Sequence, residues 1–283
     1  MKYIFFGGKA IGNYILDGLL NASILPVGVV CYRNIIEEEN LDQLRKLNIE
    51  ILTINKFKKE QNELTNFIKQ NKADTIISVA FPFILSKDVL TLVRYPVNIH
   101  TGAIPKYRGH HPLSAALLND EPYQATTVHL MAEEVDAGDI LLQDFIKVEN
   151  EDTILSIREK LMVLSLTLIK KAIHQLSTNT IYPKKQIGDV IWAPKRTPED
   201  SKINWAMPSR YTHNFIRALV DPYPNAFTFR NQNEKVNLKK SFACNTPGKV
   251  IAKTTQGQYI ISTADGVVLV ETDTDLNIGE ILT

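Results

Sequence analysis

The stretch Tyr3–Leu20, YIFFGGKAIGNYILDGLL, indicates the fold of the first part of the chain. It begins with a short apolar run that is closed by Gly7 and Gly8. The residues that follow, AIGNYILDGLL, place apolar side chains at helical spacing. A continuous apolar run that ends in glycines and passes into a helix is typical of a strand buried on both faces. The stretch therefore predicts a strand, a tight turn and a helix.

The same alternation continues to about residue 80. Further apolar, β-branched runs lie at residues 25–32, 49–54 and 74–80, and segments with helical patterns lie at residues 38–48 and 57–71. Strands and helices that alternate at this spacing predict right-handed crossovers and a doubly wound parallel sheet. Ligands of such sheets bind beyond the carboxyl ends of the strands. We therefore expect the functional residues to follow these strands.

The second half of the chain changes character near Trp205. Residues 127–148 predict two strands around an acidic loop, residues 153–176 predict the longest helix, and residues 181–208 are rich in proline and irregular. A helix is expected at residues 209–220. Short strands separated by turn signals then predict a small, mainly β, OB-like module, with runs at residues 226–230, 234–243, 248–255, 258–264 and 267–273. We place an α/β catalytic domain at residues 1–204 and the β module at residues 205–283.

Charge and cysteine content exclude several classes of protein. The chain of 283 residues has 32 basic and 31 acidic side chains, so no strong net field draws it to nucleic acid or to an anionic membrane. Cys31 and Cys244 are far apart and form no CxxC motif, which fits a reducing cytoplasm. No apolar run approaches the ~20 residues that span a bilayer, and the first residues do not resemble a signal peptide. We expect a cytoplasmic protein without a membrane partner.

The glycines after the first apolar run do not favour a dinucleotide cofactor. Gly7, Gly8 and Gly12 depart from the GxGxxG spacing, and no acidic residue directly follows the second predicted strand. Glycines at a strand-to-helix turn are common in α/β proteins. We therefore do not expect a nicotinamide cofactor.

The segment Asn98–Pro112, NIHTGAIPKYRGHHP, carries three of the six histidines of the chain. The adjacent His110 and His111 project in different directions, and His100 forms no HxH, HxxxH or HExxH motif with them. We therefore predict no metal site. His110 and His111 are expected to begin the next helix, with one of them lining a pocket for the acceptor.

Asn98 and His100 form the more informative pair. Residues two apart at the end of a strand point to the same face, so both side chains can address one pocket. An aspartate of the loop EVDAGD could fix the tautomer of His100, and an asparagine amide can donate to a developing oxyanion. Because these residue types include no nucleophile, the pattern favours direct transfer of an acyl or one-carbon group to an amine. A capped turn with incidental polar residues remains the alternative at this point.

The paired motifs NIHTGAIPKYRG and VDAGDIL resemble the signatures of formyltransferases that use 10-formyltetrahydrofolate. In that family Asn-x-His is followed by a Pro loop ending in Arg-Gly and, about 35 residues later, by Asp-x-Gly-Asp-Ile. The resemblance covers most of the first two hundred residues and implies that Asn98, His100 and Asp136 are the catalytic trio. The matching positions in full are Asn98, His100, Pro105, Arg108, Gly109, Asp136, Gly138, Asp139 and Ile140. A regulatory folate-binding module without activity is disfavoured, because the trio is complete.

The resemblance also implies a Rossmann-like first domain that binds folate and no dinucleotide. In similar enzymes the pterin lies against the segment that matches AFPFILS, which makes Phe83, Ile84 and Leu85 candidate cofactor contacts. Val135 and Asp139, beside Asp136, join them. The implied cosubstrate is 10-formyltetrahydrofolate, with no metal. The acceptor amine would attack the formyl carbon, Asn98 and His100 would stabilise the oxyanion, and His100 or a water that it holds would remove the proton.

Two branches of the family differ in their acceptor. Methionyl-tRNA formyltransferases need a basic surface, and similar members carry a Lys/Arg-rich insertion after the second strand. Here that place holds Glu37, Glu38 and Glu39. The segment KRTPEDSKINW looks like that of enzymes that formylate UDP-4-amino-4-deoxy-arabinose and related sugars, although Asn204 replaces their aspartate. We therefore expect an amino-deoxysugar carried by UDP, dTDP or GDP, used for surface glycan or lipopolysaccharide synthesis, with methionyl-tRNA as the alternative.

Candidate contacts with the acceptor follow from the same motifs. Lys106, Arg108 and Gly109 lie in the loop after His100. Lys9 replaces the usual residues after the first strand and would meet a substrate phosphate, with an ordinary surface lysine as the alternative. Tyr223, in the turn VDPYPNAFTF, would stack on the nucleobase or simply pack within the protein. A homodimer is common among similar sugar enzymes, but the sequence leaves the oligomeric state open.

Overall fold

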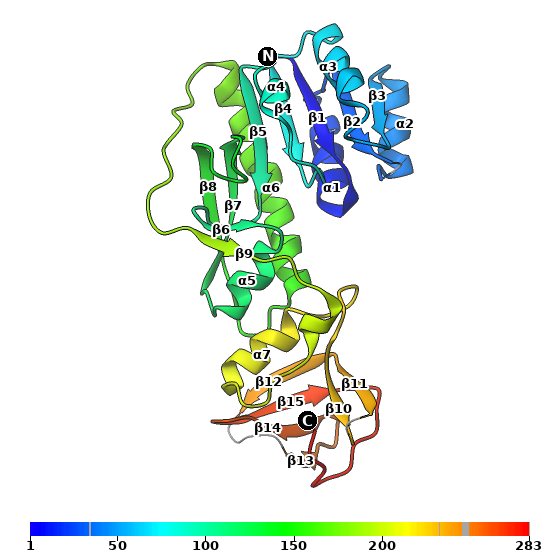
Figure 1. Ribbon diagram of the computed structural model, residues 1–283, viewed down its shortest axis with the longest axis vertical. Helices are drawn as coiled ribbons and strands as arrows, with labels where there is room; N and C mark the ends of the chain where they lie inside the picture. The colour runs from blue at the N-terminus through cyan, green and yellow to red at the C-terminus, as the bar shows by residue number, and fades with distance from the viewer. Residues whose placement is uncertain (34, 232, 245–248, 283) are drawn as a thin grey trace. The chain divides into compact units, whose positions relative to one another are not determined.

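The computed structural model describes residues 1–33, 35–231, 233–244 and 249–282 (Figure 1). Contacts within the chain divide it into two compact units. The first unit comprises Met1–Arg108, Ala125–Ile146 and Lys160–Trp192, and the second comprises Gly109–Gln124, Lys147–Glu159 and Ala193–Thr283. Three separate segments thus make up each unit. The boundary near Trp205 stays a prediction.

A seven-stranded sheet forms the centre of the first unit, in the order β3-β2-β1-β4-β5-β7-β8 (Figure 1). Strands β1 to β5 are parallel, and β7 runs antiparallel to β5. The expected doubly wound parallel sheet is therefore confirmed, and the two strands expected around the acidic loop extend it at one edge. The strands are β1 Tyr3–Gly7, β2 Gly28–Tyr32, β3 Glu50–Ile54, β4 Thr75–Val79, β5 Tyr95–His100, β7 Tyr123–Leu130 and β8 Ile140–Lys147.

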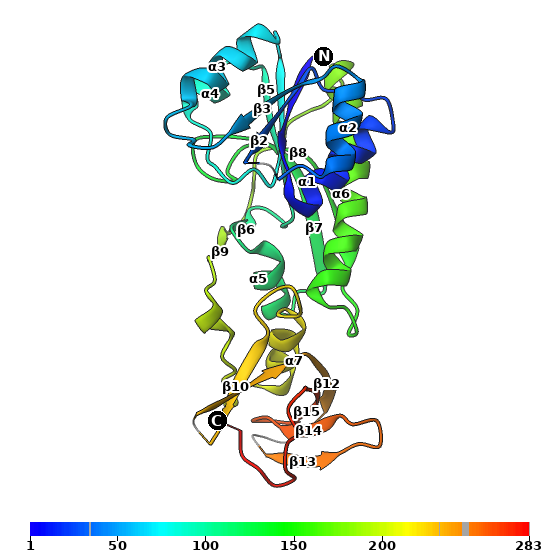
Figure 2. The ribbon, with the colours of Figure 1, turned by 90° about the vertical axis from the view of Figure 1, so that its right-hand side faces the viewer.

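Helices cover both faces of this sheet. Figure 2 shows α1, α2 and α6 on one side and α3 and α4 on the other. The long helix expected at residues 153–176 is present as α6. The helices are α1 Lys9–Leu20, α2 Glu38–Lys46, α3 Gln61–Gln70, α4 Lys87–Leu90 and α6 Ile154–Ser177.

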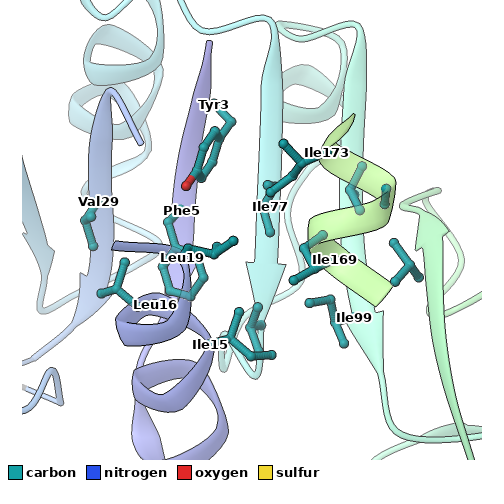
Figure 3. Packing of buried hydrophobic residues seen from close by; sticks show 14 of the residues in the cluster. Tyr3, Phe5, Ile15, Leu16, Leu19, Val29, Ile77, Ile99, Ile169 and Ile173 are labelled. Carbon is teal, nitrogen blue, oxygen red and sulfur yellow. The ribbon is translucent and has the colours of Figure 1, made fainter. Parts of the chain in front are cut away.

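The alternation of side chains along β1 explains the two hydrophobic layers. Phe5 packs in the layer beneath α1 and α6, whereas its neighbour Phe6 packs in the layer beneath α3 and α4. Successive side chains of a strand point to opposite faces, so a strand covered on both sides needs apolar side chains on both faces. Figure 3 shows Phe5 beside Leu16 and Leu19 of α1, and Ile169 of α6 in the same layer. This core holds the carboxyl ends of the parallel strands in place.

The second unit contains the small, mainly β part that the sequence predicts. Strands β10 and β11 form one hairpin, and a separate antiparallel sheet has the order β12-β15-β14-β13. Residues 234–243 were expected as one strand, but the structure divides them at Lys239 between the two sheets. The elements are α5 Pro112–Leu118, η1 Pro198–Ser201, α7 Ser209–Arg217, β10 Ala226–Arg230, β11 Glu234–Leu238, β12 Lys240–Cys244, β13 Val250–Lys253, β14 Tyr259–Ser262 and β15 Val267–Glu271.

Helix α7 ties the segments of the second unit together. It packs against α5. The buried Arg217, near its end, donates from Nη1 to the carbonyl oxygens of Glu149, Asn150 and Asp152 at 2.7, 3.2 and 3.0 Å. Burial lowers the pKa of this guanidinium to about 10. One side chain thus satisfies three carbonyl groups of the segment before α6.

A short two-stranded ladder joins two loops that are distant in sequence. Strand β6, Lys106–Gly109, pairs with β9, Ile191–Ala193, which lies in the passage expected to be irregular. The His110 amide continues this contact by donating to the Ala193 carbonyl oxygen at 3.2 Å. Within the described ranges, the helices are all too short or too polar to cross a membrane.

Candidate active site

Asn98 and His100 lie at the carboxyl end of β5, as the sheet predicts for functional residues. The register places Asn98 opposite His129 and His100 opposite Thr127 on the antiparallel strand β7. Asn98 is half-buried and His100 is 7% exposed. Their spacing by two residues puts both side chains on one face of the sheet. The edge strand β7 therefore supplies the neighbours of this pair.

Asp136 reaches the same place from the loop between β7 and β8. Its Oδ2 atom lies 3.3 Å from Nδ1 of His100, and its side chain is 9% exposed. The loop is held tightly at its base, because the Leu130 amide donates to the Asp139 carbonyl oxygen at 2.9 Å. A Cβ atom at Gly138 would come within 1.9 Å of the Leu130 carbonyl oxygen. Only glycine fits there without moving the loop that carries Asp136.

His100 and Asp136 lie close enough to pass a proton between them. Nε2 of His100 lies 2.7 Å from the Tyr107 carbonyl oxygen, and we assign the proton of that bond to Nε2, because a carbonyl can only accept. Nδ1 then faces the Asp136 carboxylate and is the ring nitrogen left to take up a proton. Burial lowers the pKa of His100, and Asp136 opposes this effect. The pair can therefore take up or release a proton, which general acid–base chemistry requires.

His129 is a member of this cluster that the sequence analysis missed. It is 1% exposed, and its Nδ1–H donates to the Leu130 carbonyl oxygen at 2.8 Å. Nε2 then accepts from the Asn98 amide at 3.2 Å and lies 3.4 Å from Oδ1 of Asp136. His129 thereby fixes which end of the Asn98 amide is a donor. The contact between His129 and Asn98 becomes visible only when β7 is paired with β5. The sequence does contain one signal of it, because His129 is a polar residue within an apolar strand.

Gln186 is a second residue that the sequence analysis missed. Its Nε2 donates to the carbonyl oxygens of Asp136 and Gly138 at 2.7 and 2.8 Å. Its Oε1 accepts from Nε and Nη2 of Arg108 at 3.2 and 2.8 Å. Arg108, whose side chain is 8% exposed, also donates to Glu134 at 2.9 Å. Gln186 and Arg108 therefore clamp both sides of the loop that carries Asp136.

The expected folate contacts lie in two environments. Phe83 stacks on Phe57 with ring centroids 4.4 Å apart and planes at 2°, and it meets the edge of Tyr32 at 4.8 Å. Ile84 is 67% exposed, whereas Leu85 is 5% exposed and packs in the layer beneath α3 and α4. Val135 and Asp139 are half-buried beside Asp136. The structure thus offers flat aromatic and apolar surfaces near the ends of β2 and β4, and the contacts themselves stay predictions.

The expected acceptor contacts are more scattered. Lys9 is exposed at the start of α1, and Lys106 is exposed on β6. The Arg108 guanidinium is directed at partners within the protein, which favours a positioning role over contact with a substrate. Gly109 has φ 105° and ends β6. Tyr223 is half-buried in the turn between α7 and β10, where its amide donates to the Val220 carbonyl oxygen at 3.0 Å.

Two further expectations concern the histidines. His111 is the residue before the first turn of α5, so His111 does lead into a helix as expected. Within the ranges that the structure describes, no group of three or more His, Cys, Asp or Glu side chains could hold a metal ion. The independence from metal stays a prediction for a chelation experiment.

Comparison with known proteins identifies the family. Residues 1–173 match the formyl transferase model, and residues 195–276 match the formyl transferase C-terminal domain. A methionyl-tRNA formyltransferase of Fusobacterium nucleatum is 33% identical over 233 residues, which are 77% of this chain and 74% of that protein.

Two solved structures share the fold. The sugar 3-N-formyltransferase WlaRD, solved with dTDP and 5-N-formyl-THF, has a TM-score of 0.74 at 21% identity and covers 98% of this chain and 99% of its own. An N-formyltransferase of Helicobacter canadensis, in complex with folinic acid and dTDP-3-aminofucose, has a TM-score of 0.73 at 22% identity, covering 96% and 99%. Since the first family model matches more than half of the residues, the chain belongs to the formyl transferase family and is a formyltransferase.

Proposed function

We propose that this formyltransferase transfers the formyl group of 10-formyltetrahydrofolate to the amine of a nucleotide-linked amino-deoxysugar. The carrier would be UDP, dTDP or GDP, and the product would serve surface glycan or lipopolysaccharide synthesis. The reaction type rests on the family and on the cluster around His100 and Asp136. The acceptor rests on the surface at the start of α2.

The residues present fit a folate. A pterin is a flat heteroaromatic ring, and the stacked rings of Phe57 and Phe83, with the exposed Ile84 beside them, offer matching apolar surfaces. The half-buried segment from Val135 to Asp139 adds backbone groups for hydrogen bonds. When bound, 10-formyltetrahydrofolate supplies an electrophilic formyl carbon.

The chain's own residues would then do three things. The Asn98 amide, with its donor end fixed by His129, donates a hydrogen bond to the formyl oxygen as negative charge develops there. The His100–Asp136 pair receives the proton that the attacking amine loses and returns a proton to N10 of the folate as the bond between N10 and the formyl carbon breaks. Arg108 and Gln186 hold the loop, so that Asp136 does not need to be reoriented during the reaction.

The acidic start of α2 is the observation that carries the choice of acceptor. Glu37, Glu38 and Glu39 are all exposed, and Glu38 begins the helix only a short loop after β2. The nearby Arg45 offsets only part of this charge, because its single positive charge is shared between Glu38 and Asp42, each at 2.8 Å. An exposed acidic surface repels the phosphates of RNA, whereas a small nucleotide sugar does not need to contact it.

Methionyl-tRNA is the second candidate acceptor. It is favoured by the identity of 33% to the Fusobacterium nucleatum methionyl-tRNA formyltransferase. The two solved sugar enzymes have lower identities and therefore support the shared fold alone.

One assay decides between the two acceptors. The protein is incubated with 10-formyltetrahydrofolate and, in parallel, with a panel of UDP-, dTDP- and GDP-linked aminosugars or with charged initiator tRNA. Release of tetrahydrofolate and the mass of the product are followed. We expect formylation of at least one sugar. Efficient formylation of the tRNA, with no turnover of any sugar, would overturn the proposal.

A further inference from the structure

Four basic side chains gather where the loops after β6 and β9 meet. His110 and His111 follow β6, and Lys195 and Arg196 follow β9 shortly after Ala193. The hydrogen bond from the His110 amide to the Ala193 carbonyl oxygen, 3.2 Å long, holds the two loops together. All four residues belong to the second unit. The sequence analysis expected one of the two histidines to line the acceptor pocket, but it did not include Lys195 or Arg196.

The four side chains influence one another electrostatically. Burial lowers the pKa of His111, and the positive charges of His110, Arg196 and Lys195 lower it further. No carboxylate is among the groups that act on His111. Opposite charges raise the pKa of a histidine, so their absence from this set indicates a positive environment.

Neither Lys195 nor Arg196 forms an ion pair with a carboxylate within the described part of the chain. Lys195 is exposed. The carboxylate of the nearby Asp200 is occupied by the amide and hydroxyl of Thr197, at 2.6 and 3.0 Å. Arg196 therefore bonds to the Asp200 carbonyl oxygen, at 2.5 Å, and not to its carboxylate.

Arg196 is held in place and yet incompletely satisfied. Its guanidinium lies over the ring of Phe215, 5.4 Å from the centroid, which fixes the orientation of the planar group. Its Nε atom is buried and has no hydrogen-bond partner. Nη2 is engaged by the Asp200 carbonyl oxygen, whereas Nη1 forms no hydrogen bond within the described residues, which leaves that nitrogen for a ligand.

The composition of the cluster matches a diphosphate. Two permanent positive charges and two imidazole N–H groups suit an anion with two or three negative charges and several acceptor oxygens, and arginine presents a fork that binds phosphate in bidentate fashion. An RNA surface would need a longer basic stripe, and the exposed Glu199 interrupts this one. A compact phosphate group on a small molecule is the better match.

We propose that His110, His111, Lys195 and Arg196 bind the diphosphate of the acceptor, an assignment that rests on a nucleotide sugar as the substrate. The site would hold the part of the acceptor that is common to all carriers, because a diphosphate is the same in UDP, dTDP and GDP. The base and the sugar would then be recognised elsewhere.

Binding without folate tests the site by itself. UDP, dTDP, GDP and inorganic pyrophosphate are titrated into the full chain by calorimetry, alongside uridine, thymidine and guanosine. We expect at least one diphosphate to bind, and Lys195→Gln and Arg196→Gln each to raise its Kd tenfold or more. Lys171→Gln removes the same charge from an exposed position on α6 and should leave the Kd unchanged. Equal Kd values for the wild type and the two variants, or no binding of any diphosphate, would overturn the assignment.

A conservative variant separates binding from folding. Arg196 packs on Phe215, so Arg196→Gln could disturb the second unit. Arg196→Lys keeps the charge but loses the fork, and we expect a smaller rise in Kd than for Arg196→Gln at an unchanged melting temperature. Lys195 is exposed, so Lys195→Gln should fold normally. A weakened Kd in Lys195→Gln with an unchanged melting temperature excludes a purely structural effect.

Turnover distinguishes this assignment from the proposed function. With a sugar acceptor, Lys195→Gln should raise the KM for the sugar tenfold or more, while kcat and the KM for folate stay within twofold. A second outcome is that pyrophosphate binds, that Lys195→Gln abolishes this binding, and that only charged initiator tRNA is formylated. In that case the nucleotide-sugar function is wrong, and the assignment of the cluster to a sugar diphosphate is wrong with it. If sugars are formylated with the same KM by the wild type and Lys195→Gln, the function stands and the diphosphate site fails.

Discussion

At the scale of single residues, the assignment of the trio makes the most direct prediction. His100→Asn removes one partner of the His100–Asp136 pair, and Asp136→Asn removes the carboxylate that orients His100. General acid–base groups contribute about 10²–10⁴-fold to a rate, so we expect kcat to fall by that order in each variant. Steady-state release of tetrahydrofolate measures it. His174→Asn makes the same change at an exposed position of α6 and should leave kcat unchanged. Near-normal rates in the His100 and Asp136 variants would refute the trio.

Substitutions of Gln186 test whether its hydrogen bonds to the loop around Asp136 contribute to kcat. Gln186→Ala leaves Arg108 and two loop carbonyl groups without their partner, so we expect kcat to fall about tenfold and the pH profile of kcat to shift. Gln186→Glu is the informative control, because a carboxylate still accepts from Arg108 but cannot donate to the carbonyl oxygens of Asp136 and Gly138. Full activity in Gln186→Glu would show that the bonds to the loop do not matter.

These residues also show what the sequence could and could not reveal about the site. Asn98 and His100 could be named as candidates because they are spaced two apart along one strand, and the resemblance to the formyltransferases singled out Asp136. His129 could not be assigned a partner, because its bond to Asn98 depends on the register between β7 and β5. Gln186 lies in a segment without periodicity, so nothing in its neighbourhood predicted which loop it would contact.

At the scale of elements, α6 makes the clearest prediction about stability. Ile169 is completely buried in the layer that α6 shares with the sheet. Ile169→Ala should lower the free energy of unfolding by about 2–5 kcal/mol, because it removes buried methyl groups and leaves a cavity. Urea denaturation measures the change. Val163→Ala, on the same helix but 57% exposed, should change it by less than about 0.5 kcal/mol. Similar losses at both positions would contradict the orientation of the helix.

Some strands could be predicted from the hydrophobic pattern of the sequence, and others could not. Strands β1, β2 and β4 could be predicted because strands covered on both faces have few polar side chains and no regular alternation with polar residues. The division of residues 234–243 at Lys239 could not, because the alternation of side chains continues through a point where the chain passes from one sheet to another. Strand β9 was missed since three residues are too few for a pattern.

At the scale of the whole molecule, buried histidines predict how stability depends on pH. Burial lowers the pKa of His100 and of His213 below the ordinary 6.5. The unfolded chain therefore binds more protons than the folded chain just below pH 6.5, and the free energy of unfolding should fall as the pH decreases there. Each histidine contributes a slope of up to ~1.4 kcal/mol per pH unit.

Urea denaturation between about pH 7.5 and 5.5 measures this slope. His213 is held neutral between Ser241 and the Asn150 carbonyl oxygen, at 3.0 and 3.1 Å, so His213→Gln should reduce the slope. His174→Gln, at an exposed position, should not. A stability that is constant over this range would contradict the prediction.

The segmented second unit limits how this enzyme can exchange parts with its relatives. A single genetic crossover near residue 204 would replace most of the last segment but would leave residues 109–124, 147–159 and 193–204 behind. The incoming sequence would then have to rebuild the packing of α5 on α7 and the bonds from Arg217 to the loop before α6. A chimera made at that point should fold poorly unless both partners share these contacts.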